Sequence, residues 1–362
     1  MKKMQPLILA MAATVALSGC TGMLNRDYQA VSPHPNYPSL EEDSSVIRAE
    51  TYQELVNAVL YFVSQGMELG NVHLVNYTGD VEEDLARACL EVATEDPLGA
   101  YAVDFIINSD YTRVVTTYEA SISIAYRRTP EQIKSVISVT GSNAIRQALQ
   151  DTLFNFSPEI AIRVGYFNED EAYIADLVRQ AYYEAPNAAL GMPEVTVTLY
   201  PGSGSQRIVE ITLLYAEDIA ILTEKRDAMV QAAQTLTSPV KDLATAADRV
   251  TALTAQLPAS FSGGTQTGRT AWDALLGGGA DSEGTALATA LLCAQLDCPC
   301  VVTKGTLNGE PHFFCILSPT ADTTFYADFS RGESPTLYSH DTFLALGYLW
   351  PDSESSMATQ DT

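Results

Sequence analysis

The stretch of sequence that decides the fold is Trp272-Asp-Ala-Leu-Leu-Gly-Gly-Gly-Ala-Asp-Ser-Glu-Gly-Thr-Ala286, which runs into an apolar segment ending at Cys293. An acidic residue and a serine just before that segment predict the start of a helix, since both are preferred N-cap residues. Ser282 would then lie where the helix dipole stabilises an anion. A simpler interpretation, compatible with the first, is that Asp281 or Ser282 only caps the helix.

Two further groups with acid–base chemistry follow this helix. Asn308-Gly309 predicts a tight hairpin turn between a strand at 300–305 and a returning strand that carries His312. The next strand, Phe325-Tyr-Ala-Asp328, ends in a carboxylate. Ser282, His312 and Asp328 therefore follow one another in the order nucleophile, base and orienting acid.

This order resembles the transglutaminase-like domain of bacterial proteins, a relative of the papain-type cysteine peptidases. In that family a Gly-x-Cys-x-Gly-x-Ala segment opens a helix, a His-x-Trp-Asn segment follows on a strand, and an Asp follows on the next strand. The resemblance implies that Ser282, His312 and Asp328 occupy the positions of a Cys-His-Asp triad, with Gly284 as in the family. Ser282 replaces the nucleophilic Cys, and His312-Phe-Phe-Cys315 lacks the family's Trp and Asn.

The exchange of Cys for Ser bears directly on activity. A thiol ionises readily, with a pKa of about 8.5 that falls beside an imidazole or a helix N-terminus. A serine hydroxyl needs a base that removes its proton during attack, and an aligned oxyanion hole. We therefore expect a domain without transamidase or peptidase activity whose cleft binds peptide or cell-wall material. Two alternatives stay open: an active acyl hydrolase or peptidase that uses Ser282, and a purely structural surface spacer.

The N-terminus has the features of an export signal. Lys2 and Lys3 precede the short apolar run 7–17, which ends in Leu17-Ser-Gly-Cys20. This ending resembles the lipobox of bacterial lipoproteins, which implies a signal peptide at 1–19 and a lipid on Cys20. No later segment approaches the roughly 20 apolar residues of a spanning helix. The sequence predicts a protein held outside the cytoplasmic membrane by its lipid.

Charge and cysteine usage exclude several classes of function. The chain has 45 acidic and 20 basic residues and a net charge of −25, which argues against a nucleic-acid or anionic-lipid partner. No cofactor or metal site is predicted, because Cys298-Pro-Cys300 lacks zinc-ligand spacing and no histidines cluster near it. Five cysteines remain after Cys20, an odd number that cannot pair completely. Cys89 and Cys293 are expected as core thiols, and one bridge within 293–300 stays open.

An internal repeat accounts for the region between the linker and this domain. At an offset of 89, Leu85 falls on Ile174, Pro97 on Pro186 and Tyr126 on Tyr215, with no gap. Each copy is expected to contain a helix, a short strand, a second helix and two closing strands. Tyrosines of the repeat could form a binding surface, but packing is the simpler interpretation.

The predicted fold class is α+β, with a duplicated α-β-α-β-β module followed by a C-terminal transglutaminase-like (papain-like) α+β domain. A helix over 240–256 is expected before a Gly/Ser/Thr loop at 261–268, and Tyr348 and Trp350 are expected to dock on the core. The predicted domains are a signal peptide (1–19), a disordered linker (20–45), repeat 1 (46–135), repeat 2 (136–226), the transglutaminase-like domain (227–351) and a disordered tail (352–362).

Overall fold

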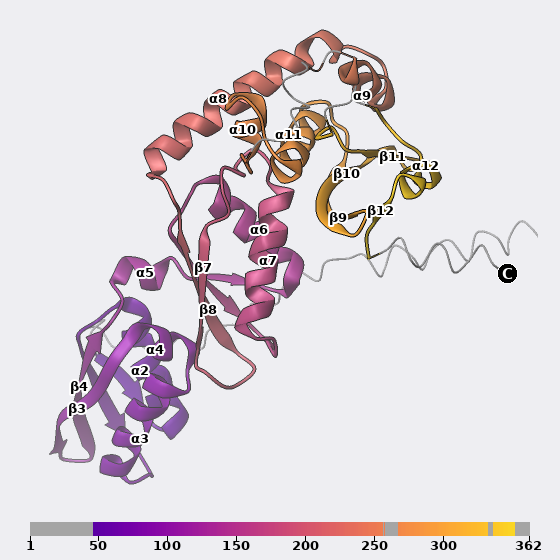
Figure 1. The fold of residues 1–362 in the computed structure, drawn as a ribbon. Helices are drawn as coiled ribbons and strands as arrows, with labels where there is room; N and C mark the ends of the chain where they lie inside the picture. Colours follow the sequence, from indigo (N-terminus) through magenta and orange to yellow (C-terminus); the bar gives the residue numbers. More distant parts are fainter. Residues whose placement is uncertain (1–45, 256, 258–266, 332–335, 352–362) are drawn as a thin grey trace, which may run out of the picture. The chain divides into compact units, whose positions relative to one another are not determined.

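The computed structural model describes residues 46–351 apart from 256, 258–266 and 332–335 (Figure 1). The predicted signal peptide, Cys20, the linker, most of the 261–268 loop and the tail lie outside the described residues. Within them, helices and three four-stranded sheets form an α+β fold, as predicted. No helix of this part of the chain combines the length and the apolar character that crossing a membrane requires.

The first sheet has the strand order β1-β2-β4-β3, with β1 parallel to β2 and the other pairs antiparallel. Helices α2 and α3 are amphipathic and bury their apolar faces in the same core as the sheet. The elements of this part are β1 (Val46–Ala49), α2 (Tyr52–Gln65), β2 (Leu69–Val75), α3 (Val81–Thr94), α4 (Pro97–Ala102), β3 (Val103–Val114) and β4 (Thr117–Tyr126).

The second sheet has the order β5-β6-β8-β7, again with one parallel pair, β5 and β6. Its elements are α5 (Pro130–Lys134), β5 (Ile137–Val139), α6 (Gly141–Phe154), β6 (Glu159–Val164), α7 (Glu171–Glu184), β7 (Glu194–Tyr200) and β8 (Arg207–Leu214). Both sheets thus begin with a strand that the predicted α-β-α-β-β order omits. These strands have four and three residues, too few for an alternating pattern to be recognised.

The buried positions also correct the ungapped offset of 89. In α2 and α6 the buried residues correspond at an offset of 90: Leu55 with Ile145, Val59 with Leu149, and Val63 with Leu153. In α3 and α7 they correspond at 89: Leu85 with Ile174, Ala88 with Leu177, and Cys89 with Val178. Superposing the two copies of the repeat therefore needs a one-residue gap in the second copy, between α6 and α7. The residues that match at an offset of 89 lie mainly in the later part of each copy.

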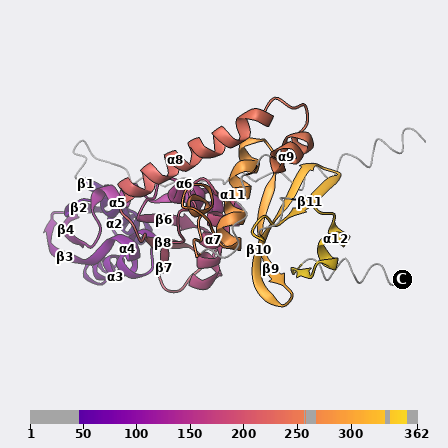
Figure 2. The same cartoon turned by 45° about the horizontal axis from the view of Figure 1, so that its top comes forward.

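The C-terminal part is built around one buried helix. It comprises α8 (Ile219–Thr237), η1 (Ser238–Val240), α9 (Ala246–Thr254), α10 (Ala271–Leu275), α11 (Ser282–Gln295), β9 (Cys300–Leu307), β10 (Glu310–Thr320), β11 (Thr323–Ala327), α12 (His340–Ala345) and β12 (Tyr348–Leu349). The sheet order is β11-β10-β9-β12, all antiparallel. Helix α11 packs on β9 and β10, and also against α8 and α10 (Figure 2).

Local predictions in this part are partly confirmed. Asn308 and Gly309 both have positive φ, 53° and 88°, and form the two-residue turn between β9 and β10. Tyr348 and Trp350 are buried in an aromatic cluster. The expected helix over 240–256 is wrong at its start, because Thr245 is extended and caps a shorter helix, α9, by accepting a hydrogen bond from the Asp248 N–H.

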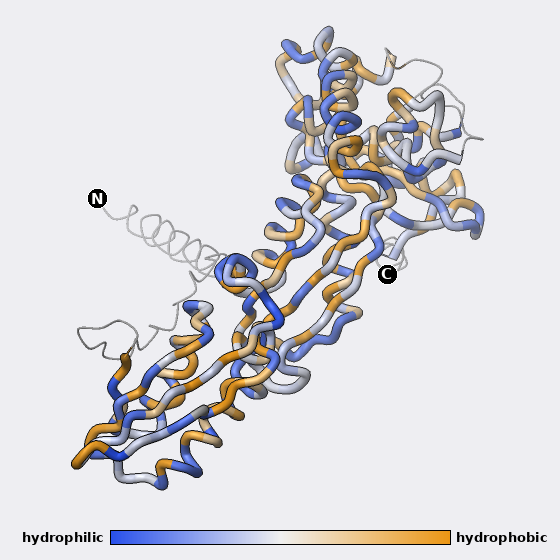
Figure 3. The backbone as a smooth tube through the Cα atoms, turned by 90° about the vertical axis from the view of Figure 1, so that its left-hand side faces the viewer, coloured by the Kyte–Doolittle hydropathy of each residue, from blue (hydrophilic) through white to orange (hydrophobic). Residues whose placement is uncertain are grey.

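Burial of apolar faces stabilises each sheet. Figure 3 shows hydrophobic and hydrophilic residues alternating along the strands and helices, as expected for elements with one buried face. One partly buried ion pair joins the first part of the chain to the second sheet: Arg128 Nη2 lies 2.6 Å from Glu210 Oε2. Tyr200 donates a hydrogen bond to the same carboxylate at 3.1 Å, and the Arg128 guanidinium lies over the Tyr101 ring at 5.1 Å.

Removal of the cation from this ion pair should destabilise the protein. Glu210 is only 8% exposed, so Arg128→Ala leaves a buried carboxylate without its counter-charge and is expected to cost about 3 kcal/mol. Urea unfolding would measure the free energy of unfolding. The matched control is Arg48→Ala, which breaks the exposed Arg48–Glu50 pair and should change stability by less than about 0.5 kcal/mol. Equal effects of the two substitutions would contradict this account of the Arg128–Glu210 pair.

Candidate functional site

Helix α11 presents Ser282 at its N-terminus. The N-cap is Asp281, whose Oδ1 accepts hydrogen bonds from the N–H groups of Glu283 (2.9 Å) and Gly284 (3.1 Å). Ser282 is therefore the first helical residue and not the cap. Its own N–H has no hydrogen-bond acceptor among the described residues, and it lies at the positive end of the helix dipole.

Glycine at position 284 is required by close packing. A Cβ built there would lie 2.7 Å from the carbonyl oxygen of Thr270 and 2.7 Å from the Ala280 Cβ. Thr270 caps α10, and its hydroxyl accepts a hydrogen bond from the Asp273 N–H. The first turn of α11 thus lies against the start of α10, which fixes the position of Ser282.

The adjacent strands β10 and β11 supply a histidine–aspartate pair. His312 lies on β10 and Asp328 directly follows β11, and His312 Nε2 lies 2.7 Å from Asp328 Oδ2. Tyr348 donates a hydrogen bond to the same oxygen at 2.6 Å. Ser330 donates to the other oxygen, Oδ1, from its hydroxyl (2.6 Å) and from its N–H (2.9 Å). The carboxylate is held on both oxygens and orients the imidazole.

These contacts determine the ionisation of Asp328. The Asp328 side chain is 2% exposed, and this burial alone would raise its pKa. Hydrogen bonds from His312, Ser330 and Tyr348 outweigh that effect, so the pKa of Asp328 lies below its usual value. Asp328 is thus an anion at neutral pH that can stabilise a positive charge on the imidazole.

The structure brings all three predicted residues together but bonds only two of them directly. Ser282 Oγ accepts a hydrogen bond of 3.2 Å from the N–H of Phe313, the residue after His312. Among the described residues no hydrogen bond joins Ser282 to the imidazole. The Nε2 atom of His312 faces Asp328, with the Ser330 hydroxyl 3.5 Å away. In this structure the Ser282 hydroxyl is therefore bonded to the backbone of the strand that carries His312, next to that residue.

The two residues after Phe313 belong to the core and not to the site. Phe314 is 1% exposed and packs against the rings of Phe343, Tyr348 and Trp350. The thiol of Cys315 donates to the carbonyl of Ala286 at 3.2 Å. The imidazole is oriented by Asp328.

Other residues at the site were not predicted from the sequence. Tyr183, on α7, donates a hydrogen bond of 2.7 Å to Glu283 and packs its ring 5.6 Å from that of Phe313. The guanidinium of Arg269 lies 3.5 Å from Asp281 and 3.6 Å from Glu283. The surroundings of Ser282 therefore include aromatic rings and charged groups of both signs.

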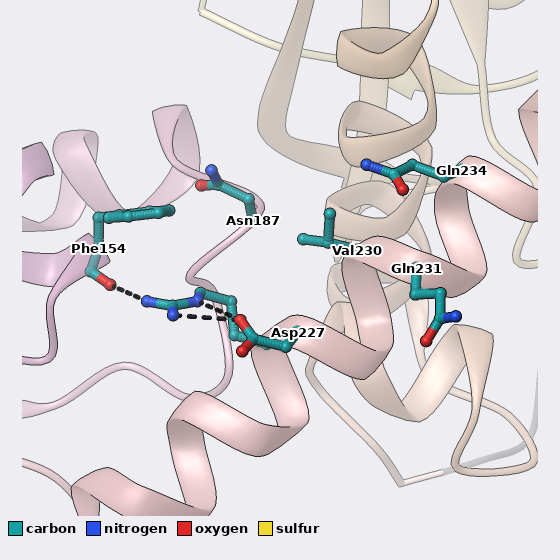
Figure 4. A pocket seen from close by; sticks show the side chains of 7 residues that line it. Phe154, Asn187, Asp227, Val230, Gln231 and Gln234 are labelled. Carbon is teal, nitrogen blue, oxygen red and sulfur yellow. Dashed lines mark hydrogen bonds and ion pairs between the residues drawn. The ribbon is translucent and has the colours of Figure 1, made fainter.

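Two hollows lie away from the triad positions. One, of about 550 Å³, is lined by Phe154, Asn187, Arg226, Asp227, Val230, Gln231 and Gln234 (Figure 4). There Arg226 donates a hydrogen bond to the Phe154 carbonyl at 2.8 Å and pairs with Asp227. The other, of about 410 Å³, borders Cys298 and Cys300. Among the described residues no group of three or more His, Cys, Asp or Glu side chains is arranged to hold a metal ion.

Comparison with known proteins gives only distant likenesses, all to solved structures. No protein-family model matches the chain, and no curated protein matches it. Among solved structures the chain is similar to one described as "Crystal structure of a TGase", with 15% sequence identity and a TM-score of 0.26. The match covers 59% of this chain and 65% of the other, so it spans slightly less than two thirds of that protein. A likeness at this level assigns no activity, and the candidate site rests on its own geometry.

The hydrogen bonds to Asp328 predict a pH-dependent contribution to stability. Because its pKa is lower in the folded state than in the unfolded chain, the stabilisation is fully present above about pH 4 and is lost as the pH falls through the folded-state value. Asp328→Asn should therefore reduce the free energy of unfolding at pH 7 by about 2 kcal/mol, and by less at pH 3. Urea titrations at both pH values would measure this difference.

The control for this titration is Asp322→Asn in the exposed turn between β10 and β11. It should leave the free energy of unfolding within about 0.5 kcal/mol of the native value at both pH values. A loss for Asp328→Asn that stays equally large at pH 3 would contradict a stabilising carboxylate anion.

Proposed function

We propose that this chain is an extracytoplasmic lipoprotein, anchored to the bacterial cell membrane through Cys20, whose transglutaminase-like domain (227–351) binds peptide or cell-wall material without catalysing acyl transfer. The observation that carries the proposal is the hydrogen bond of Ser282 Oγ with the Phe313 N–H and not with His312. The lipid anchor follows from the lipobox-like Leu17-Ser-Gly-Cys20. The acidic composition argues against nucleic acid as a partner.

The geometry around Ser282 supports a non-catalytic domain for a chemical reason. A serine attacks only if a base takes its proton as the new bond forms, so its oxygen must lie within hydrogen-bond reach of the imidazole. Here that oxygen accepts the Phe313 N–H instead. A misplacement of about 1 Å is enough to cost 10²-fold in rate.

The surroundings of the site suit a peptide ligand. Tyr183 and Phe313 present adjacent rings, which bury apolar area and still allow polar contacts at their edges. Glu283 and Arg269 add a carboxylate and a guanidinium beside these rings. A peptide offers complementary groups for all four: apolar side chains, amides, and charges of either sign. The surroundings of Ser282 thus contain both positive and negative charge, whereas the chain as a whole is strongly acidic.

A serine acyl hydrolase or peptidase remains the second candidate, favoured by one observation. The His312–Asp328 pair is fully formed at 2.7 Å, and the unpaired Ser282 N–H at the helix N-terminus could donate to an oxyanion. Rotation of the Ser282 side chain toward the imidazole would complete a Ser-His-Asp arrangement. The two candidates thus differ in the direction of one hydroxyl.

A fluorophosphonate probe separates the two candidates. The purified chain should show no covalent labelling above that of Ser282→Ala, because the hydroxyl lacks a base. The control is Ser64→Ala, at a serine of α2 whose hydroxyl donates to the Tyr61 carbonyl. If the native protein were labelled, and both Ser282→Ala and His312→Ala abolished that label, the protein would be a serine hydrolase and the proposal would fail.

Binding is tested separately by co-sedimentation with insoluble peptidoglycan and by fluorescence titration with peptides derived from it. We expect the native chain to bind these ligands. Ser282→Phe should weaken that binding at least about tenfold, because the larger ring occupies the space beside Phe313 and Tyr183. Thr251→Phe, on an exposed position of α9, is the matched control and should bind as the native chain does. Absence of binding in every case would favour a structural spacer over a binding domain.

A further inference from the structure

Four cysteines lie on α11 or on the elements packed against it: three are at the end opposite Ser282, and the thiol of the fourth, Cys315, lies further along the helix at the Ala286 carbonyl. Cys293 lies near the C-terminus of the helix, Cys298 in the turn that follows, Cys300 at the start of β9 and Cys315 on β10. The thiols of Cys298 and Cys300 are close enough to that of Cys293 to influence its pKa, and Cys315 likewise influences that of Cys300. All four are free in the structure, and the candidate site uses none of them.

The end of α11 brings Cys293 and Cys298 together through its backbone. Asp297 has a left-handed φ of 52°, the N–H of Cys298 donates to the carbonyl of Cys293 at 3.0 Å, and the N–H of Asp297 donates to Ala294 at 3.4 Å. These two bonds define a Schellman motif, which frequently brings the side chains three residues before and two after the end of the helix into contact. Those two side chains are here Cys293 and Cys298, 1% and 3% exposed.

The pairing of β9 with β10 argues against a bridge from Cys300 to Cys315. Cys300 lies opposite Leu317 and Cys315 lies opposite Val302, so the two cysteines are diagonal neighbours. Diagonal positions in an antiparallel pair are roughly 7–8 Å apart, whereas disulfides need Cα atoms within about 4.4–6.8 Å. Cys300 remains a competing partner for Cys293, and the experiment below separates the two.

We propose that Cys293 and Cys298 form a disulfide when the chain folds in an oxidising environment, closing the end of α11. The two thiols lose two protons and two electrons to an external disulfide such as oxidised glutathione, which is reduced to two thiols as the new S–S bond forms. The extracytoplasmic location in the proposed function would supply such an environment. The in vitro experiment does not depend on that location.

The surroundings of the two sulfurs indicate a structural bond and not a reversible switch. The neighbouring Cys293 thiol and burial raise the pKa of Cys298, so little thiolate exists in the folded protein. Exchange needs thiolate, and a buried bond is therefore formed during folding and broken slowly afterwards. A hollow of about 410 Å³ is lined by Cys298 and Cys300 and could admit a small disulfide.

The test is to refold the full chain in a glutathione redox buffer, block free thiols with a maleimide, and digest with a protease that cuts before aspartate. Cleavage before Asp281, Asp297 and Asp322 separates Cys293 from Cys298, so the bond appears as a linked pair of peptides, 281–296 and 297–321. Fragmentation before Pro299 distinguishes Cys298 from Cys300 in the native chain itself. We expect the link at Cys298, retained in Cys300→Ala and absent in Cys298→Ala.

A link assigned to Cys300, or a fully maleimide-labelled set of thiols after refolding in the oxidising buffer, would overturn the proposal. The fragmentation result on the native chain decides the matter if a variant does not fold. As a second measurement, the oxidised native chain should melt about 2–4 °C above the reduced chain. Cys298→Ala should abolish that redox dependence of the melting temperature, whereas Cys89→Ala, at a buried thiol in α3, should retain it.

Discussion

Burial of helix α11 on all sides is the constraint on which the C-terminal part depends. Its ten residues from Gly284 to Cys293 are all buried, packed between the β9–β10 strands and the helices α8 and α10. A helix enclosed in this way can neither slide nor rotate without opening cavities, and cavities in a core cost several kcal/mol. Its first residue, Ser282, is consequently held in one place, and its last turn sets the positions of the cysteines. The proposed binding site and the proposed disulfide lie at opposite ends of this helix.

The site combines a hydrogen-bonded His312–Asp328 pair with a serine whose hydroxyl is bonded to the Phe313 N–H. Asp328, buried and bonded by Ser330 and Tyr348, holds His312 in a fixed orientation whether or not a nucleophile is present. Ser282 binds the strand backbone instead. A longer thiol side chain at that position would place its sulfur differently, and it would ionise without a base in contact. The His312–Asp328 pair is thus formed independently of Ser282, whose hydroxyl is held by the strand backbone.

Much of this could be predicted from the sequence where signals are local. The Asp281-Ser282 start of α11 and the Asn308-Gly309 turn follow from cap and turn patterns. The approach of His312 to Asp328 was expected from the resemblance in the order of Ser282, His312 and Asp328. The strands β1 and β5 were missed because they are too short to show a period. Tyr183 could not be placed, since it is 100 residues from its partner Glu283 and packs there through tertiary contact alone. The direction of the Ser282 hydroxyl could not be predicted from the sequence either, because it depends on the distance between α11 and β10.

The central claim is that the Ser282 hydroxyl is not activated by His312. The most direct measurement is an atomic-resolution crystal structure of the purified chain, at a pH above neutrality, in which the distance from Ser282 Oγ to the nearest imidazole nitrogen is determined. The account predicts a separation beyond about 3.2 Å, the reach of a catalytic hydrogen bond, with the oxygen bonded to the Phe313 N–H. An oxygen within that reach of the imidazole, and released from Phe313, would contradict the account and identify a formed Ser-His-Asp triad.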